Sequence, residues 1–276
     1  MEKHQAFQEQ ECPRILRLIT YLAPSIPLEY FEVLKEYLEE KLDCYVYLLC
    51  ESRWSGPPDD RVDPFTTGDA DIGFVCAPTF QRMHSKSSSK AALLGVAPAH
   101  ITPHGSDLPV YYTEVVVHKD NCDRFKRFED LRGSVWAYND AHSLSGYWIT
   151  RLELEKMAES TTTFFNKTLQ SGSHLKSIEM ILDKTIDGTG IDSNVLAFQM
   201  KAHPKLKDKL HVVTSWGPLP VYPGVVNSEL PEDLKKSITG HLLNMHQEPK
   251  WQAKLNDYMV SKFVPVTLNQ YQLEIQ

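Results

Sequence analysis

Two hydrophobic patterns alternate along the first fifty residues of the chain. Apolar residues follow one another closely in Arg14–Leu22 and in Cys44–Cys50, and short apolar runs of this kind are typical of buried strands. Between them, Glu29–Leu42 carries apolar residues three or four positions apart and charged residues on the opposite face, which predicts an amphipathic helix. Together the three segments predict a strand–helix–strand unit of a parallel sheet.

The same alternation continues toward the C-terminus and predicts an α/β fold throughout. The segment Gln81–Lys90 is polar and rich in serine, so we expect an exposed loop there. Further strands are expected at Asp71–Cys76, Ala91–Ala97, Tyr111–His118, Ser134–Tyr138, Thr161–Phe165 and Leu210–Trp216. Further helices are expected at Gly146–Glu159, Leu175–Lys184, Asn194–Ala202, Pro231–Gln247 and Lys250–Tyr258.

Three polar turns precede the expected helices in the middle of the chain. They are Tyr138–Trp148, Gln170–His174 and Asp187–Ser193, and each brings Ser, Gly, His or Asp to the start of a helix. A helix N-terminus presents unpaired backbone N–H groups and the positive end of the helix dipole, so it favours an anion. Ordinary helix capping explains one such turn. Three such turns in alternating α/β order indicate that they line one common cleft.

The first turn has the features of an oxyanion site. Ser143 or Ser145 can cap the following helix and add a hydroxyl donor beside the backbone N–H groups. Gly146 has no side chain, so a ligand could approach the backbone closely. The alternative for this turn, taken alone, is a capped helix that binds nothing.

Composition and charge exclude several classes of protein. A net charge of −7 without a basic stripe argues against a nucleic-acid-binding protein. No apolar run approaches the roughly 20 residues of a membrane span. The N-terminal residues lack the apolar core of a secretion signal, so we expect a cytoplasmic protein, or a secreted one if a signal was removed. Five cysteines without a CxxC spacing fit a reducing compartment better than a disulfide framework.

Motifs for cofactor, metal or hydrolase chemistry are missing from the sequence. There is no HExxH motif, no Cys/His zinc spacing, no GxGxxG and no P-loop, so we expect neither a cofactor nor a metal. Ser143, His174 and Asp192 are the residue types of a hydrolase triad. However, the G-x-S-x-G elbow is absent and these residue types are too common to identify a triad.

The order of motifs resembles the phosphonate-binding family of ABC-importer solute receptors, a branch of the type 2 periplasmic-binding-protein fold. The resemblance implies two α/β lobes joined by crossing hinge strands, with the ligand between the lobes and closure by hinge bending. It places lobe one at residues 1–110 and 218–276 and lobe two at residues 111–217. The segments that carry it are LRLITYLAP, YLEEKLDCYVYL, GDADIGFV, YYTEVVVHKD, DLRGSVWAYNDAHSLSGY, SGSHLKSIEMI, DGTGIDSNVL and WGPLPVYPGVV.

The resemblance also implies a set of ligand-binding residues. The family segment that binds phosphonate oxygens matches the run from Ser143 to Gly146, and here Leu144 stands where the family has a hydroxyl residue. Trp54 stands where relatives carry tyrosine, and both changes favour a larger or more apolar ligand. Helix capping, an internal hydrogen bond or simple packing could explain each residue instead. The full set is Ser143, Leu144, Ser145, Gly146, His174, Tyr111, Asp192 and Trp54.

These observations predict a monomeric binding protein for a small oxyanion-bearing metabolite, phosphonate-like or phosphate-like. An enzyme built on the same fold is the alternative, and Cys76 or His174 would then carry the reaction. A third alternative is a ferric site with Tyr111, His174 and Asp192 as ligands, which tyrosinate absorption would reveal. The missing signal suggests a receptor recruited to an intracellular role.

Overall fold

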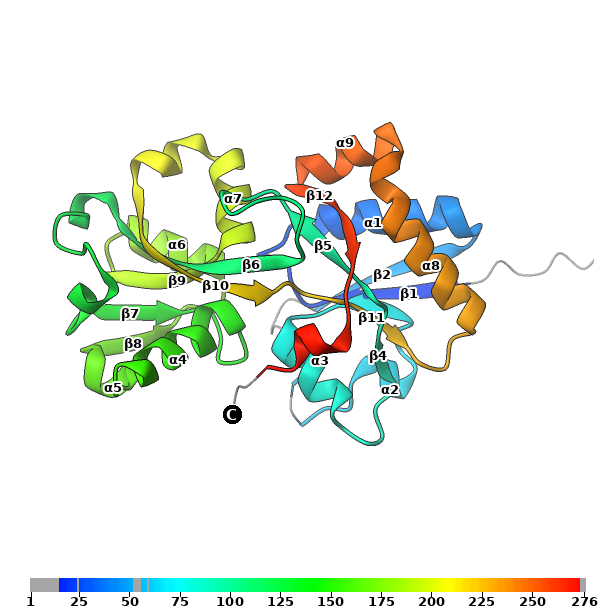
Figure 1. The fold of residues 1–276 in the computed structure, drawn as a ribbon, viewed down its shortest axis with the longest axis horizontal. Helices are drawn as coiled ribbons and strands as arrows, with labels where there is room; N and C mark the ends of the chain where they lie inside the picture. Colours follow the sequence, from blue (N-terminus) through cyan, green and yellow to red (C-terminus); the bar gives the residue numbers. More distant parts are fainter. Residues whose placement is uncertain (1–14, 24, 52–55, 59, 274–276) are drawn as a thin grey trace, which may run out of the picture.

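A computed structural model describes residues 15–23, 25–51, 56–58 and 60–273 of the chain. Two five-stranded sheets lie side by side, each with helices packed on it, and two long strands run between them (Figure 1). The protein therefore has two lobes joined by crossing strands, as the sequence predicts. In the part of the chain that the structure describes, no helix is long and apolar enough to cross a membrane.

Lobe one is built on the strand–helix–strand unit expected at the start of the chain. Strands β1 (Ile15–Thr20) and β2 (Tyr45–Cys50) pair in parallel. Helix α1 (Leu28–Leu42) buries Tyr30, Phe31, Leu34 and Leu38 in the core. The strand order is β2 (Tyr45–Cys50), β1 (Ile15–Thr20), β3 (Ile72–Phe74), β11 (Gly224–Asn227) and β4 (Ala91–Leu93). The helices are α1 (Leu28–Leu42), α2 (Pro64–Thr67), α3 (Ala77–His84), α8 (Glu232–Asn244) and α9 (Pro249–Asp257).

Lobe two holds the three polar turns. Its strand order is β10 (Leu210–Pro220), β6 (Val110–His118), β9 (Gly188–Asp192), β7 (Val135–Tyr138) and β8 (Lys167–Gln170), with β7 parallel to both β8 and β9. Its helices are the π-helical turn η3 (Leu144–Trp148), α4 (Ile149–Lys156), α5 (Thr161–Phe164), α6 (His174–Leu182) and α7 (Ser193–Ala202). Two hydrophobic clusters, around Trp136 and around Ile181, form its core.

The chain passes between the lobes before β6 and again after β10, which pair antiparallel along most of their length. A two-stranded sheet of β5 (Val96–His100) and β12 (Val260–Pro265) completes lobe one. The short 3-10 helices are η1 (Lys119–Asn121), η2 (Phe128–Leu131), η4 (Pro204–Asp208), η5 (Met245–Gln247) and η6 (Leu268–Tyr271).

The turn expected at Asp187–Ser193 is largely strand β9 instead, because these residues pair with β6 and β7. Two further expected elements are wrong. Thr161–Phe165, predicted as a strand, begins with helix α5, because Ser160 and Thr163 form a reciprocal capping box at its start. The expected loop at Gln81–Lys90 overlaps the second half of α3, whose Phe80 and Met83 pack into the core. In both places a tertiary or capping interaction overrides the local composition.

Candidate functional site

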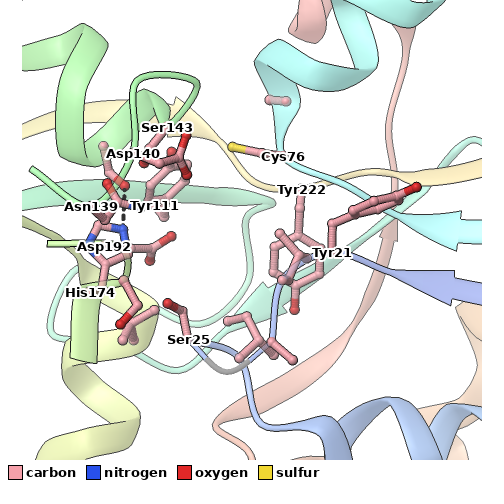
Figure 2. A pocket seen from close by; sticks show the side chains of 18 of the residues that line it. Tyr21, Ser25, Cys76, Tyr111, Asn139, Asp140, Ser143, His174, Asp192 and Tyr222 are labelled. Carbon is pink, nitrogen blue, oxygen red and sulfur yellow. Dashed lines mark hydrogen bonds between the residues drawn. The ribbon is translucent and has the colours of Figure 1, made fainter. Parts of the chain in front are cut away.

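A cavity of about 70 Å³ lies where the two lobes meet (Figure 2). Strands β1 and β3 of lobe one and strands β7, β8 and β9 of lobe two all end at it, because the residues that follow each strand line the cavity. Ligands of α/β sheets bind outside the carboxyl ends of strands, so this position is the expected one for a ligand. The polar side chains in the lining are Tyr21, Ser25, Cys76, Tyr111, Asn139, Asp140, Ser143, Ser145, Ser173, His174, Asp192 and Tyr222.

The start of η3 supplies neutral hydrogen-bond donors to this cavity. Ser143 is its N-cap, and its Oγ accepts a hydrogen bond from the Gly146 N–H at 3.1 Å, which leaves the hydroxyl proton free to be donated elsewhere. Ser145 Oγ lies 3.2 Å from His174 Nε2, and both side chains are buried. The backbone is fixed as well, because Thr113 Oγ1 donates to the Ser145 carbonyl at 3.1 Å.

His174 opens helix α6 and joins the second polar turn to the first. Ser173 is the N-cap of α6, and its Oγ accepts the Lys176 N–H at 3.1 Å. Burial lowers the pKa of His174 from 6.5 to about 4, so its imidazole is neutral near pH 7. A neutral imidazole beside a serine hydroxyl can donate one hydrogen bond without bringing a charge.

Asp192 closes the cavity at the third polar turn. Its Oδ1 accepts the Asn194 N–H at 2.7 Å and so caps helix α7. Burial raises the pKa of its carboxyl from 3.8 to about 7, and the neighbouring Glu114 acts in the same direction. Near neutral pH the site therefore holds a carboxyl group that can be either a donor or an anion.

Cys76 and Tyr111 contribute neutral groups as well. Burial raises the pKa of the Cys76 thiol to about 12, so a reactive thiolate is scarce near pH 7. The Leu144 backbone N–H, from lobe two, acts on the pKa of this thiol in the opposite direction. Burial also raises the pKa of the Tyr111 phenol well above 10, and the neighbouring Ser145 acts in the opposite direction. Neither group offers a charge to a ligand.

Among the described residues that line the cavity there is no lysine and no arginine, although there are two aspartates, Asp140 and Asp192. Asp140 is buried and Asp192 is half-buried, and Asp140 Oδ1 accepts the His142 N–H at 2.6 Å. Within the part of the chain that the structure describes, neutral donors and helix starts are therefore the groups that can hold an anion in this cavity.

Five of the eight residues expected in the site line the cavity: Tyr111, Ser143, Ser145, His174 and Asp192. Leu144 does not, because its side chain packs into the main hydrophobic core, so it gives no reason to expect a more apolar ligand. Gly146 also lies outside the lining and packs against Asn139. Trp54 lies outside the described residues.

Sequence reasoning gave no ligand-binding role to Asn139, Asp140, Cys76 or Tyr222. The polar pair Asn139–Asp140 follows directly after β7, and a polar pair at the carboxyl end of a buried strand is a signal that could have identified it. Cys76 follows β3 in the same way, but a single cysteine after an apolar run is indistinguishable from a buried hydrophobic residue. Tyr222 lies in the bend after β10. It reaches the cavity only because the chain crosses between the lobes there, so no local sequence pattern indicates its position.

The chain matches one protein family over residues 23–271, the family described as ABC transporter, phosphonate, periplasmic substrate-binding protein. No curated protein matches it. Among solved structures, it resembles a binding-protein component of an ABC phosphonate transporter from Pseudomonas aeruginosa, with a TM-score of 0.77, 16% identity and coverage of 94% of this chain and 83% of the other.

Two further structures share the fold. PhnD1 from Prochlorococcus marinus in complex with methylphosphonate gives a TM-score of 0.75 at 16% identity, covering 94% of this chain and 95% of that one. The periplasmic aliphatic sulphonate binding protein from Escherichia coli gives 0.61 at 12% identity, covering 94% and 88%. At such identities these likenesses establish the fold alone.

Proposed function

The chain belongs to the phosphonate family of periplasmic substrate-binding proteins of ABC transporters, and from this premise we propose that it binds a small phosphonate in the cavity between its lobes. The observation that carries the proposal is the convergence of Ser143, Ser145 and His174 on that cavity. The proposed ligand set is these three residues with Tyr111 and Asp192. We also propose lobe boundaries between residues 110 and 111 and between residues 217 and 218.

The oxyanion end of the ligand fits lobe two. The hydroxyls of Ser143 and Ser145 are buried and line the cavity at the start of η3, where the positive end of the helix dipole favours an anion. The neutral imidazole of His174 can donate its one N–H to Ser145 Oγ, which leaves the Ser145 hydroxyl proton for the ligand. Hydrogen bonds from several neutral donors to a charged acceptor are strong in a water-poor cavity, so the site needs no lysine or arginine.

The remainder of the ligand faces carboxyl groups. Asp140 and Asp192 both line the cavity, and an ionised carboxylate would repel a dianion. A singly charged phosphonate avoids part of this repulsion, and a ligand that carries an amine or hydroxyl group would pair with Asp192. A cavity of about 70 Å³ leaves room for only a few heavy atoms beyond the phosphonate group. Methylphosphonate and short aminoalkylphosphonates are the compounds we expect to bind.

A thermal-shift screen followed by calorimetry tests the proposal. The panel contains methylphosphonate, a short aminoalkylphosphonate, phosphate, sulfate and acetate. A ligand at one hundred times its Kd adds roughly 2.7 kcal/mol to the free energy of unfolding. For a chain of this size that corresponds to a rise in Tm of roughly 5–10 °C.

Three variants make the result specific. Ser145→Ala removes a hydroxyl donor from the cavity and His174→Ala removes the imidazole beside it, and we expect phosphonate affinity to fall roughly tenfold or more for each. Ser237→Ala, on helix α8 of lobe one, is the matched control and should bind as the unaltered protein does. If no oxyanion raises the Tm of well-folded protein, or if Ser145→Ala binds unchanged, the proposed site is wrong.

Proteins of this family are normally periplasmic. The expectation of a cytoplasmic location stays a prediction, which cell fractionation tests. The expected monomeric state likewise stays a prediction, which light scattering of the purified protein tests.

A further inference from the structure

A basic hollow of about 330 Å³ lies on lobe two, separate from the cavity between the lobes. None of the residues that line it lines that cavity. The end of β6, the end of α6 and the 3-10 helix η4 meet to form this hollow. In Figure 1, the yellow segment that joins α7 to β10 runs along this edge of the lobe. Its lining is His118, Leu182, His203, Lys205, Leu206 and Lys209.

The hollow has an apolar floor. Leu182 and Leu206 are half-buried, and both pack against the Ile181 cluster of the lobe-two core. Their remaining exposed surface is open to a partner. A partner that covered these two leucines would gain hydrophobic burial at the bottom of a concave site, where such contacts contribute most to binding.

The rim of the hollow is positively charged in a protein whose net charge is −7. Lys205 and Lys209 are exposed, His203 is exposed beside them, and no carboxylate is part of the lining. The nearby Asp120 is engaged by Lys184, whose Nζ lies 2.7 Å from its Oδ2. The backbone also brings Lys119 to this edge, because its N–H donates to the Lys209 carbonyl at 2.7 Å.

We propose that this basic hollow is a docking site for a partner protein that presents a short acidic segment with an apolar side chain. The apolar floor accepts the apolar side chain, and Lys205 and Lys209 pair with the flanking carboxylates. A nucleic acid or a lipid surface fits less well. Phosphate backbones make no use of a leucine floor, and a bilayer surface cannot enter a concave hollow of this size.

Fluorescence anisotropy with synthetic peptides tests the docking site. The probe is a short labelled peptide in which Glu alternates with Leu. One control peptide replaces every Glu with Gln, and another replaces every Leu with Ser. We expect only the acidic, apolar peptide to bind, and we expect its binding to weaken as NaCl is raised to about 0.5 M because exposed charges are screened.

Charge-reversal variants locate the binding. Lys205→Glu should weaken peptide binding roughly fivefold or more, since one attractive pair becomes repulsive. Lys167→Glu changes the net charge equally at an exposed position on β8 and should leave binding unchanged. Both variants should keep the Tm response to methylphosphonate, which separates this proposal from the proposed function.

The docking site is wrong if the acidic, apolar peptide does not bind, or if Lys205→Glu and Lys167→Glu weaken it equally. It is also wrong if the Glu-to-Gln peptide binds as well as the acidic one. Binding to vesicles rich in phosphatidylglycerol that Lys205→Glu abolishes, without peptide binding, would overturn the peptide partner in favour of a membrane surface.

Discussion

Gly146 has no room for a methyl group. A Cβ at this position would lie 1.7 Å from Asn139 Oδ1 and 2.8 Å from its Cγ. Since Asn139 lines the cavity, Gly146→Ala must push this side chain or move η3 itself. We expect a loss of roughly 1–3 kcal/mol in the free energy of unfolding, as for other overpacked sites, together with weaker phosphonate binding. Urea denaturation and calorimetry measure the two effects.

Gly240 is the matched control for this substitution. It lies inside helix α8, and a Cβ there would meet no atom within 4 Å. Alanine favours a helix interior over glycine, so Gly240→Ala should stabilise the protein by roughly 0.5–1 kcal/mol. Ligand affinity should stay the same. A destabilised Gly240→Ala together with a neutral Gly146→Ala would contradict the packing argument.

Asp192 makes the stability of the fold depend on pH. Its pKa is raised from 3.8 to about 7 in the folded protein, so the unfolded chain loses this proton first as the pH rises. As the pH rises from about 4 to about 7, the free energy of unfolding therefore loses the contribution of the Asp192 proton. Above pH 7 this contribution stays lost. Asp192→Asn keeps an oxygen that can accept the Asn194 N–H but removes the titration.

Thermal denaturation of the two proteins across this window checks the sign. The difference in Tm, Asp192→Asn minus the unaltered protein, should increase from pH 4 to pH 8. A difference that stays constant with pH would show that Asp192 is not a buried carboxyl of raised pKa.

The residue types that bind an oxyanion could be predicted because they occur at helix starts. Ser143, His174 and Asp192 were identifiable for this reason, and the structure brings them to one cavity. Cys76 and Tyr222 could not be identified, since nothing in their neighbours distinguishes a cavity wall from ordinary packing. A side chain that reaches a site only after the chain has crossed between lobes leaves no local pattern in the sequence.

At the scale of elements, helix α7 contacts the cavity at one end and lobe one at the other. Asp192 caps its N-terminus in the cavity. Near its C-terminus, Lys201 Nζ donates to the carbonyls of Asn256 and Asp257 at 2.7 and 3.2 Å, at the end of α9. An ammonium group is favourable at the negative end of a helix dipole. These contacts join the lobes on one side of the cavity.

Lys201→Met should weaken the contact between the lobes while keeping most of the aliphatic side chain. We expect phosphonate affinity to fall by roughly threefold to tenfold, in line with the loss of one charge near a helix end. Lys236→Met, on the exposed face of α8, should leave affinity unchanged. Calorimetry measures the affinities, and small-angle scattering should show a more extended average shape for Lys201→Met alone.

Element boundaries follow the strength of the local pattern. Helix α1 agrees with its expected range almost to the residue because its apolar and charged faces are regular over fifteen residues. Strand β9 was not predicted, although it lies in the middle of the lobe-two sheet, because Gly188–Asp192 reads as a turn. The glycines are needed there for close packing, since a Cβ at Gly190 would lie 2.9 Å from the Ser145 carbonyl oxygen.

At the scale of the whole molecule, the cavity proposed to hold the ligand is lined from both lobes. Lobe one contributes the residues after β1 and β3, and lobe two contributes the residues after β7, β8 and β9. A ligand held there makes contacts with both lobes at once, and it therefore opposes any opening that separates them. A ligand held by lobe two alone would oppose only local motion within that lobe.

Hydrogen exchange followed by mass spectrometry distinguishes these two cases. With saturating methylphosphonate, we expect exchange to slow at Cys76–Ala77 in lobe one and at Asn139–Ser145 and Gly172–His174 in lobe two. Lys205–Lys209, far from the cavity lining, serves as the internal control and should exchange as before. Protection confined to lobe two would contradict binding between the lobes, because the same ligand contact must restrain both walls of the cavity.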